Sequence, residues 1–169
     1  MGRSNIVLIG MPGSGKSTVG VLLAKALGYD FVDTDLLIQL REGCTLEELI
    51  RRKGIDAFLD IEGEVCAALE AENTVIATGG SAVYREHAME RLRADGRLVY
   101  LQVELPELTR RLSDLAGRGV ALREGQTLAD LYTERIALYE RWADLTVAEG
   151  DMTLAETVAA VAEALTART

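Results

Sequence analysis

The stretch GMPGSGKST at residues 10–18 constrains the fold more than any other part of the sequence. It follows the apolar run NIVLI, which is typical of a buried strand, and apolar residues then recur at helical spacing from Val19 to Leu27. A glycine-rich turn from strand to helix with the order G-x-x-x-x-G-K-[ST] is the pattern of a phosphate-binding loop. The alternative is a glycine-rich turn that carries a lysine by chance. The strand before the turn and the helix after it favour nucleotide binding.

The residue types of this loop suit a nucleoside triphosphate. Glycines at positions 10, 13 and 15 let several backbone N–H groups approach the phosphates together. The following helix directs its unsatisfied N–H groups and the positive end of its dipole at the same place. Lys16 adds a charge near the β and γ oxygens, and Ser17 offers a hydroxyl to Mg²⁺. We therefore expect ATP and Mg²⁺ as cofactors, with nucleotide-binding positions at Gly13, Ser14, Gly15, Lys16, Ser17 and Thr18.

Strands and helices alternate along the whole chain. Besides the first strand and helix, strands are predicted at 29–35, 73–80, 97–103 and 145–148, and helices at 46–53, about 56–71, about 127–143 and from 153 onward. This order predicts a parallel sheet with helices on both faces, which is an α/β fold with three layers. A chain of 169 residues suits a single domain, 1–169.

Charge and hydropathy exclude several kinds of partner. The net charge is −9, which argues against nucleic acid and anionic membranes, because polyanions attract basic surfaces. No apolar run approaches the roughly 20 residues that span a bilayer. The chain begins with a predicted strand and not with a secretory signal. We expect a cytoplasmic protein that acts on a small molecule and binds neither nucleic acid nor membrane.

Two further stretches follow predicted strands and belong to the same edge of the sheet. Asp33 and Asp35 are predicted at the end of the second strand, where both carboxylates point the same way. Such a pair can hold Mg²⁺ and accept a proton from an attacking hydroxyl, although a strand-end turn with a helix cap is the alternative. Gly79 and Gly80, at the glycine-rich end of the third strand, predict close approach of a ligand to the backbone, unless they form only a turn.

Arginines are the remaining groups that phosphoryl transfer needs, because cations stabilise the charge that moves. Residues 113–126 lose periodicity, carry three glycines and include Arg118, which predicts a mobile loop that closes over the ligand. Arg135 lies inside a predicted long helix, and by itself that setting favours a charged surface residue.

With these motifs in this order, the chain resembles a shikimate kinase over nearly all its length. The stretches that carry the resemblance are GMPGSGKSTVGVLLAKALGYDFVDTD, GIDAFLDIE, VIATGGSAV, the arginine-containing loop and ERIALYERWAD. The resemblance implies a P-loop kinase fold with a five-stranded parallel sheet, a substrate-binding helical segment at 33–62 and a mobile lid at 112–124. It implies transfer of the γ-phosphate of ATP to a hydroxyl of shikimate, with Mg²⁺, by a monomer.

The resemblance also assigns roles to individual residues. Lys16, Asp35 and Arg118 are the implied catalytic residues, with Asp35 as the base and Arg118 reaching the phosphates from the lid. Ser17 and Asp33 serve Mg²⁺, and Arg111 stands where the family stacks an arginine on adenine. The implied substrate-binding residues are Asp35, Gly79, Gly80 and Arg135, which pairs with the substrate carboxylate.

The departures from the family pattern fall at the acceptor site. The family has G-E-x-x-F-R-x-x-E, whose arginine binds the shikimate carboxylate and whose glutamate holds that arginine. This chain keeps Phe58 and Glu62 but has Leu59 in place of the arginine, and Ser81 replaces the third glycine of a triplet. Loss of a bidentate arginine should cost a carboxylate ligand about 1.5–3 kcal/mol.

Several functions therefore stay open at this point. The first is phosphorylation of shikimate with a substitute cation. The second is phosphorylation of another small alcohol, such as a hydroxy amino acid. A non-catalytic ATP-binding protein and a nucleoside or nucleotide kinase are further alternatives. The presence of Asp33, Asp35 and Arg118 argues against the non-catalytic protein.

Overall fold

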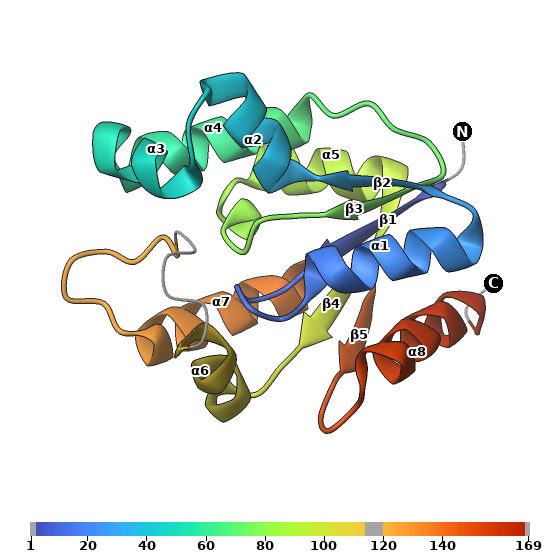
Figure 1. Cartoon of the computed structure of the whole chain (residues 1–169). Helices are drawn as coiled ribbons and strands as arrows, with labels where there is room; N and C mark the ends of the chain where they lie inside the picture. Colours follow the sequence, from blue (N-terminus) through green and yellow to red (C-terminus); the bar gives the residue numbers. More distant parts are fainter. Residues whose placement is uncertain (1–2, 114–119, 168–169) are drawn as a thin grey trace.

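A computed structural model of the chain describes residues 3–113 and 120–167. Its centre is a five-stranded sheet in the order β2-β3-β1-β4-β5, in which every neighbouring pair is parallel (Figure 1). The strands are β1 Asn5–Ile9, β2 Asp30–Asp33, β3 Thr74–Ala77, β4 Gly96–Gln102 and β5 Leu145–Ala148. The helices are α1 Lys16–Leu27, α2 Thr34–Glu42, α3 Leu46–Lys53, α4 Ile55–Ala67, α5 Glu86–Asp95, α6 Leu105–Ser113, α7 Leu128–Trp142 and α8 Leu154–Thr166, with a 3-10 turn η1 Ala82–Tyr84. The predicted α/β/α sandwich with five parallel strands is confirmed.

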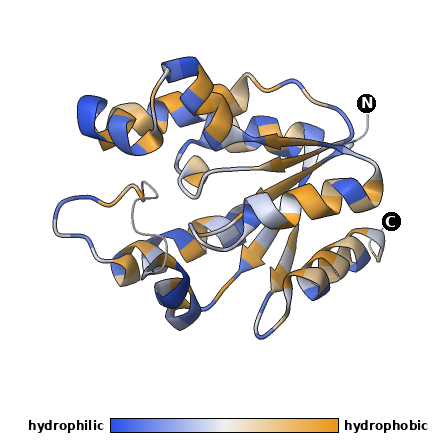
Figure 2. Cartoon of the chain, viewed as in Figure 1, coloured by the Kyte–Doolittle hydropathy of each residue, from blue (hydrophilic) through white to orange (hydrophobic). Residues whose placement is uncertain are grey.

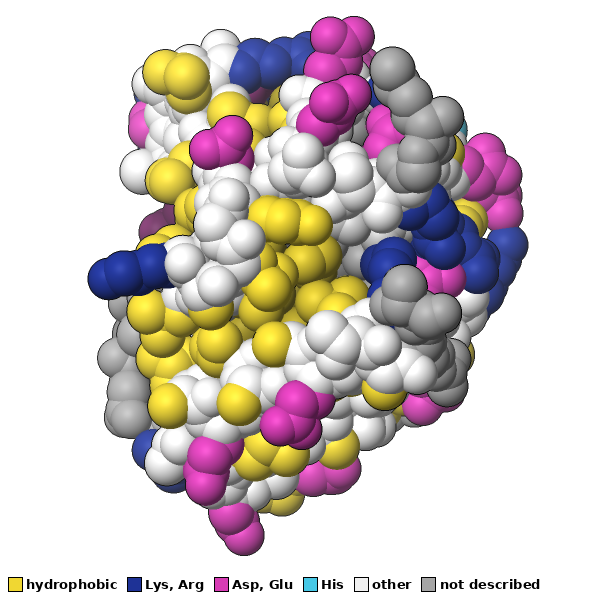
Figure 3. All heavy atoms as spheres, turned by 90° about the vertical axis from the view of Figure 1, so that its right-hand side faces the viewer, with side chains coloured by type: hydrophobic (Ala, Val, Ile, Leu, Met, Phe, Trp, Pro, Cys, Tyr) yellow, Lys and Arg dark blue, Asp and Glu magenta, His cyan; other side chains and the backbone are white. Residues whose placement is uncertain are grey.

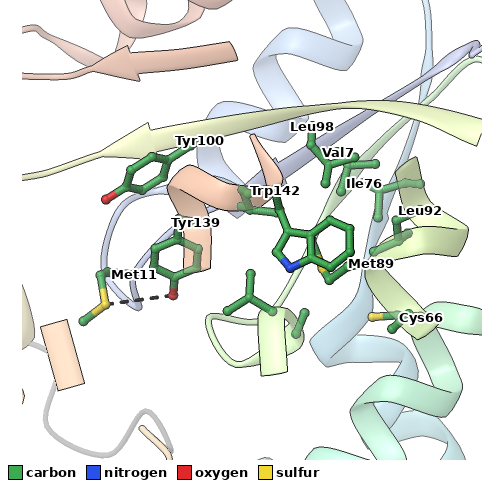
Figure 4. Close-up of a cluster of buried hydrophobic side chains, with 14 of the residues drawn as sticks. Val7, Met11, Cys66, Ile76, Met89, Leu92, Leu98, Tyr100, Tyr139 and Trp142 are labelled. Carbon is green, nitrogen blue, oxygen red and sulfur yellow. Dashed lines mark hydrogen bonds between the residues drawn. The ribbon is translucent and has the colours of Figure 1, made fainter. Parts of the chain in front are cut away.

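The strands consist largely of hydrophobic residues (Figure 2), as is typical of a parallel sheet that helices cover on both faces. Ile6 and Leu8 of β1 pack in a cluster with residues of α1 and α8. Val7 and Ile9, which point the other way, pack in a second cluster with residues of α4, α5 and α7. Figure 4 shows this second cluster, in which the Tyr139 hydroxyl also lies 3.9 Å from the Met11 sulfur. The sheet is thus held in place from both sides.

Three predicted boundaries were wrong. The strand predicted at 73–80 ends at Ala77, before the glycine turn. The strand predicted at 29–35 ends at Asp33, because the Asp33 carboxylate accepts a hydrogen bond of 2.9 Å from the N–H of Asp35 and caps α2. Asp35 therefore lies in the first turn of a helix and not on the strand. The helix predicted at about 56–71 ends at Ala67, where the N–H of Leu69 turns back to the carbonyl of Cys66.

The remaining elements lie close to their predicted positions. Thr127 with Asp130, and Thr153 with Glu156, form reciprocal capping boxes at the starts of α7 and α8. Of the predicted loop at 113–126, Ser113 is instead the last residue of α6, and residues 120–126 contain no helix or strand. No helix in the described ranges is both long enough and apolar enough to cross a bilayer.

Figure 3 shows the face at the right of Figure 1, where hydrophobic side chains gather near the middle and charged side chains lie mostly around them. The N-terminus lies on this side of the molecule, so this face is remote from the loop that follows β1. It is therefore separate from the carboxyl ends of the strands, where the candidate site lies.

Leu22 and Leu23 test how α1 is held on the sheet. Leu23 is fully buried against the sheet, whereas Leu22, its neighbour on α1, is 38% exposed. We expect Leu23→Ala to lower the free energy of unfolding by about 2–5 kcal/mol, through lost burial and the cavity left behind. Leu22→Ala should cost less than about 1 kcal/mol. Urea denaturation of both variants measures this, and equal losses would contradict the packing described.

Candidate active site

The carboxyl ends of the parallel strands open into one cavity of about 920 Å³. It brings together the loop after β1, the start of α2, the turn after β3, and parts of α4, α6 and α7. The predicted site residues that line it are Gly13, Ser14, Gly15, Lys16, Ser17, Thr18, Asp33, Asp35, Gly79, Gly80, Arg111 and Arg135. Arg118 lies outside the described residues, as does part of the predicted lid at 112–124.

The loop after β1 has the geometry of an anion cradle. Gly13 and Gly15 adopt φ of 83° and 84°, which favours glycine, and Gly15 precedes α1 without any side-chain cap. The first N–H groups of α1 therefore face the cavity. Lys16 Nζ donates to the carbonyl oxygens of Gly10 and Met11 at 2.7 and 2.8 Å. Burial lowers the pKa of Lys16 to about 8, although Asp35 opposes this.

Asp33 and Asp35 differ in their surroundings. The Ser17 hydroxyl donates to Asp33 Oδ2 at 2.5 Å, so the end of β2 is joined to the start of α1. Asp35 faces the cavity from the first turn of α2, near Lys16. Burial, and then the charge of Asp33, raise the pKa of Asp35 to about 6, while Lys16 lowers it. Asp35 is thus an ionised acceptor at neutral pH and is protonated in mild acid.

The turn after β3 leaves no room for side chains at its glycines. A Cβ on Gly80 would lie 2.7 Å from Pro12 Cδ and 2.9 Å from an Arg135 nitrogen. The Gly80 carbonyl accepts a hydrogen bond of 2.6 Å from the Tyr139 hydroxyl. Protein atoms therefore occupy part of the space beside these glycines. The rest of the turn lines the cavity.

Arg135 lies on the inner side of α7 and is only 1% exposed, so the surface interpretation of its helical setting was wrong. Its Nε donates to the Tyr84 hydroxyl at 3.3 Å, and its guanidinium lies 5.2 Å from the centre of the Tyr84 ring. No carboxylate in the described ranges forms an ion pair with it. A buried cation at the wall of a cavity suits an anionic ligand.

Arg111 lies on α6 beside the phosphate loop. It donates to the Gly13 carbonyl at 3.2 Å and to Glu149 Oε2 at 3.1 Å, and it also pairs with Glu107. These contacts fix the guanidinium beside the phosphate loop. Glu149, just beyond β5, was not predicted as a site residue; its position after the end of a parallel strand was the available signal.

Glu62 is the most unusual group of the cavity. It is 1% exposed, and Oε2 accepts a hydrogen bond of 2.5 Å from the Ser81 hydroxyl. Oε1 is buried without a hydrogen-bond partner among the described residues. Burial raises the pKa of Glu62 to about 7, although Ser81 opposes the shift. The sequence analysis noted Glu62 as a retained residue of the acceptor-site pattern and assigned it no role of its own.

Leu59 lies away from this cavity. It is buried on α4 in an apolar cluster with residues of α2 and α3 and with Ala121. Its side chain therefore joins the helical segment at 33–62 to the chain that follows residues 114–119. The position contributes packing here and no charge.

The profile of the shikimate kinase family matches residues 12–166. A shikimate kinase of Thermobifida fusca is 39% identical over 98% of this chain and 96% of its own. One of Clostridium botulinum is 42% identical over 81% of this chain and 83% of its own. The chain belongs to the shikimate kinase family. It is therefore a kinase, and members of this family use ATP.

Solved structures of the shikimate kinase family share this fold. The shikimate kinase of Acinetobacter baumannii in complex with shikimate superposes with a TM-score of 0.89 and 28% identity, covering 98% of this chain and 94% of that one. The likeness spans the sheet, the phosphate loop and the helical segment at 33–62. The interpretation as a non-catalytic ATP-binding protein is thereby set aside.

The burial of Glu62 predicts a pH-dependent cost to the fold of this kinase. Because its pKa rises from 4.5 unfolded to about 7 folded, the unfolding free energy falls as pH rises between these values. We expect Glu62→Gln to raise the unfolding free energy by about 1–3 kcal/mol at pH 8 and by less than about 1 kcal/mol at pH 5.

Urea denaturation at the two pH values measures this effect. Glu47→Gln, at an exposed position of α3, is the matched control and should change little at either pH. A Glu62→Gln effect that is the same at pH 5 and pH 8 would contradict a buried carboxyl with a raised pKa.

Proposed function

We propose that this chain transfers the γ-phosphate of ATP to a ring hydroxyl of shikimate. The observation that carries the proposal is the single cavity that joins the phosphate loop, Asp35 and Arg135. It offers a donor site, a proton acceptor and a cation for a carboxylate within one space. Family membership supports the same reaction.

The residues present fit a magnesium nucleotide. Ser17 and Asp33 supply a hydroxyl and a carboxylate, which are oxygen ligands of the kind Mg²⁺ prefers, and they already lie in contact. Mg²⁺, when bound, neutralises phosphate charge. The uncapped N-terminus of α1 and Lys16 suit the phosphates, and Arg111 suits the adenine side of the nucleotide.

In the proposed mechanism, Asp35 orients the acceptor hydroxyl and takes its proton. Lys16, which is buried beside the loop, stabilises the charge that develops on the transferred group. We assign Arg118 of the lid to the same charge. Arg135 holds the substrate carboxylate, and the backbone at Gly79 and Gly80 lies against the substrate.

We further propose that the chain acts as one domain and as a monomer in the cytoplasm. The segment at 33–62 provides the acceptor site, and 112–124 is its lid, of which Val120 and Ala121 already line the cavity. Closure of such a lid excludes water and so limits hydrolysis of ATP.

The direct test is ADP release from Mg·ATP with shikimate, with the phosphorylated product identified by phosphorus NMR. We expect shikimate-dependent turnover, and we expect Lys16→Ala to lower kcat about 100-fold or more, since its charge acts where negative charge develops. Lys25→Ala, at an exposed position of the same helix, is the control and should turn over normally. Turnover with a hydroxy amino acid but not with shikimate would overturn the proposal.

The raised pKa of Asp35 predicts an acid limb in the pH profile. Because the carboxylate form is the proton acceptor, kcat/KM should fall tenfold per pH unit below about pH 6. Loss of the Lys16 charge should lower it again above about pH 8. Asp33→Asn removes a charge that raises the Asp35 pKa, so its residual activity should show an acid limb at lower pH. A limb that does not move would contradict Asp35 as the group titrating.

A further inference from the structure

Glu62 has an oxygen that the fold leaves unused. Oε1 is buried at the wall of the cavity without a hydrogen-bond partner in the described chain, whereas Oε2 is occupied by Ser81. Leaving a buried charged acceptor without a partner is costly. Such an oxygen is normally completed by a partner, and Glu62 is one of the residues that line the cavity.

The sequence explains why this oxygen is available. The residue one turn earlier on α4, where the family pattern has the arginine that its glutamate holds, is Leu59. The Leu59 side chain packs into an apolar cluster and supplies no donor. Ser81 donates to Oε2, and Oε1 has no hydrogen-bond partner among residues 3–113 and 120–167.

A carboxylate oxygen of Asp35 lies near Glu62 Oε1. A Cβ built on Gly79 would lie 2.2 Å from Glu62 Oε1 and 2.8 Å from Asp35 Oδ1. Both oxygens are measured from the same point, so they lie within about 5 Å of each other. The glycine leaves open the space between them. Two acceptors at this spacing suit a ligand with hydrogen-bond donors on neighbouring atoms.

We propose that Glu62 contacts the substrate directly and determines specificity. Its Oε1 accepts a hydrogen bond from a donor group next to the hydroxyl that faces Asp35. This inference rests on the proposed function and deepens it: the acceptor substrate carries either two adjacent hydroxyls or a hydroxyl with a nearby ammonium group. For shikimate, the donor is the ring hydroxyl next to the phosphorylated one.

A purely structural role for Glu62 makes a different prediction. If Glu62 served only to hold Ser81, a glutamine oxygen would accept the same hydrogen bond, and discrimination between substrates would not change. The glutamine amide, in contrast, presents a donor and not an acceptor when its oxygen faces Ser81. Discrimination between substrates therefore separates the two roles.

The experiment compares two acceptors in the wild-type protein and in Glu62→Gln. One acceptor is shikimate, and the other is its analogue lacking the ring hydroxyl next to the phosphorylated one. We expect Glu62→Gln to raise the KM for shikimate about 10- to 100-fold, the loss of a hydrogen bond to a charged group, with the KM for ATP unchanged. The KM for the analogue should be the same in both proteins.

Two further variants control the comparison. Glu64→Gln changes an exposed carboxylate on the same helix, and both KM values should stay as in the wild type. Ser81→Gly restores the glycine of the family triplet and removes the hydrogen bond to Oε2. It should keep the preference for shikimate over the analogue, because Oε1 makes the proposed contact.

The outcomes separate this inference from the proposed function. If the wild type uses shikimate and Glu62→Gln raises both KM values equally, the inference is wrong and the proposed function stands. If the wild type uses a hydroxy amino acid instead, the proposed function is wrong. The same comparison with its analogue lacking the amino group then decides the role of Glu62. Absence of turnover with every acceptor overturns both.

Discussion

The parallel pairing of β1 with β3 and β4 is the constraint on which the site depends. It brings the phosphate loop after β1 beside the glycine turn after β3, although about 65 residues separate them along the chain. The pairing is stabilised by apolar side chains that alternate between the two helical layers. A site made of loops is thereby held by a rigid sheet.

The polar interior of the cavity is a compromise between binding and stability. Lys16, Asp35, Glu62 and Arg135 all lose water, and their opposite charges offset only part of that cost. Desolvation is the main cause of all three shifts: it raises the pKa values of Asp35 and Glu62 and lowers the pKa of Lys16. These groups are poised near neutral pH, where small changes of ligand charge alter their protonation.

The departures from the family pattern lie on the acceptor side of the cavity and not on the donor side. The phosphate loop keeps its pattern, and in it Lys16 donates to the Gly10 carbonyl and Ser17 donates to Asp33. On α4, Leu59 has joined an apolar cluster with Ala121, and Ser81 has taken the Glu62 oxygen. At the two positions that depart from the family pattern, Leu59 thus contributes packing and Ser81 a hydrogen bond, and neither contributes a charge.

The sequence by itself determined the fold class, the phosphate loop and most element boundaries, because strand and helix periodicity, glycine positions and capping residues are local signals. Only the tertiary structure buried Arg135 against Tyr84 and left Glu62 Oε1 without a partner in the described part of the chain. Each depends on what surrounds a side chain in space. The sequence around a helical arginine does not show whether that side of the helix faces water or a cavity wall. Packing between segments that are distant in the sequence decides whether the arginine is exposed or buried.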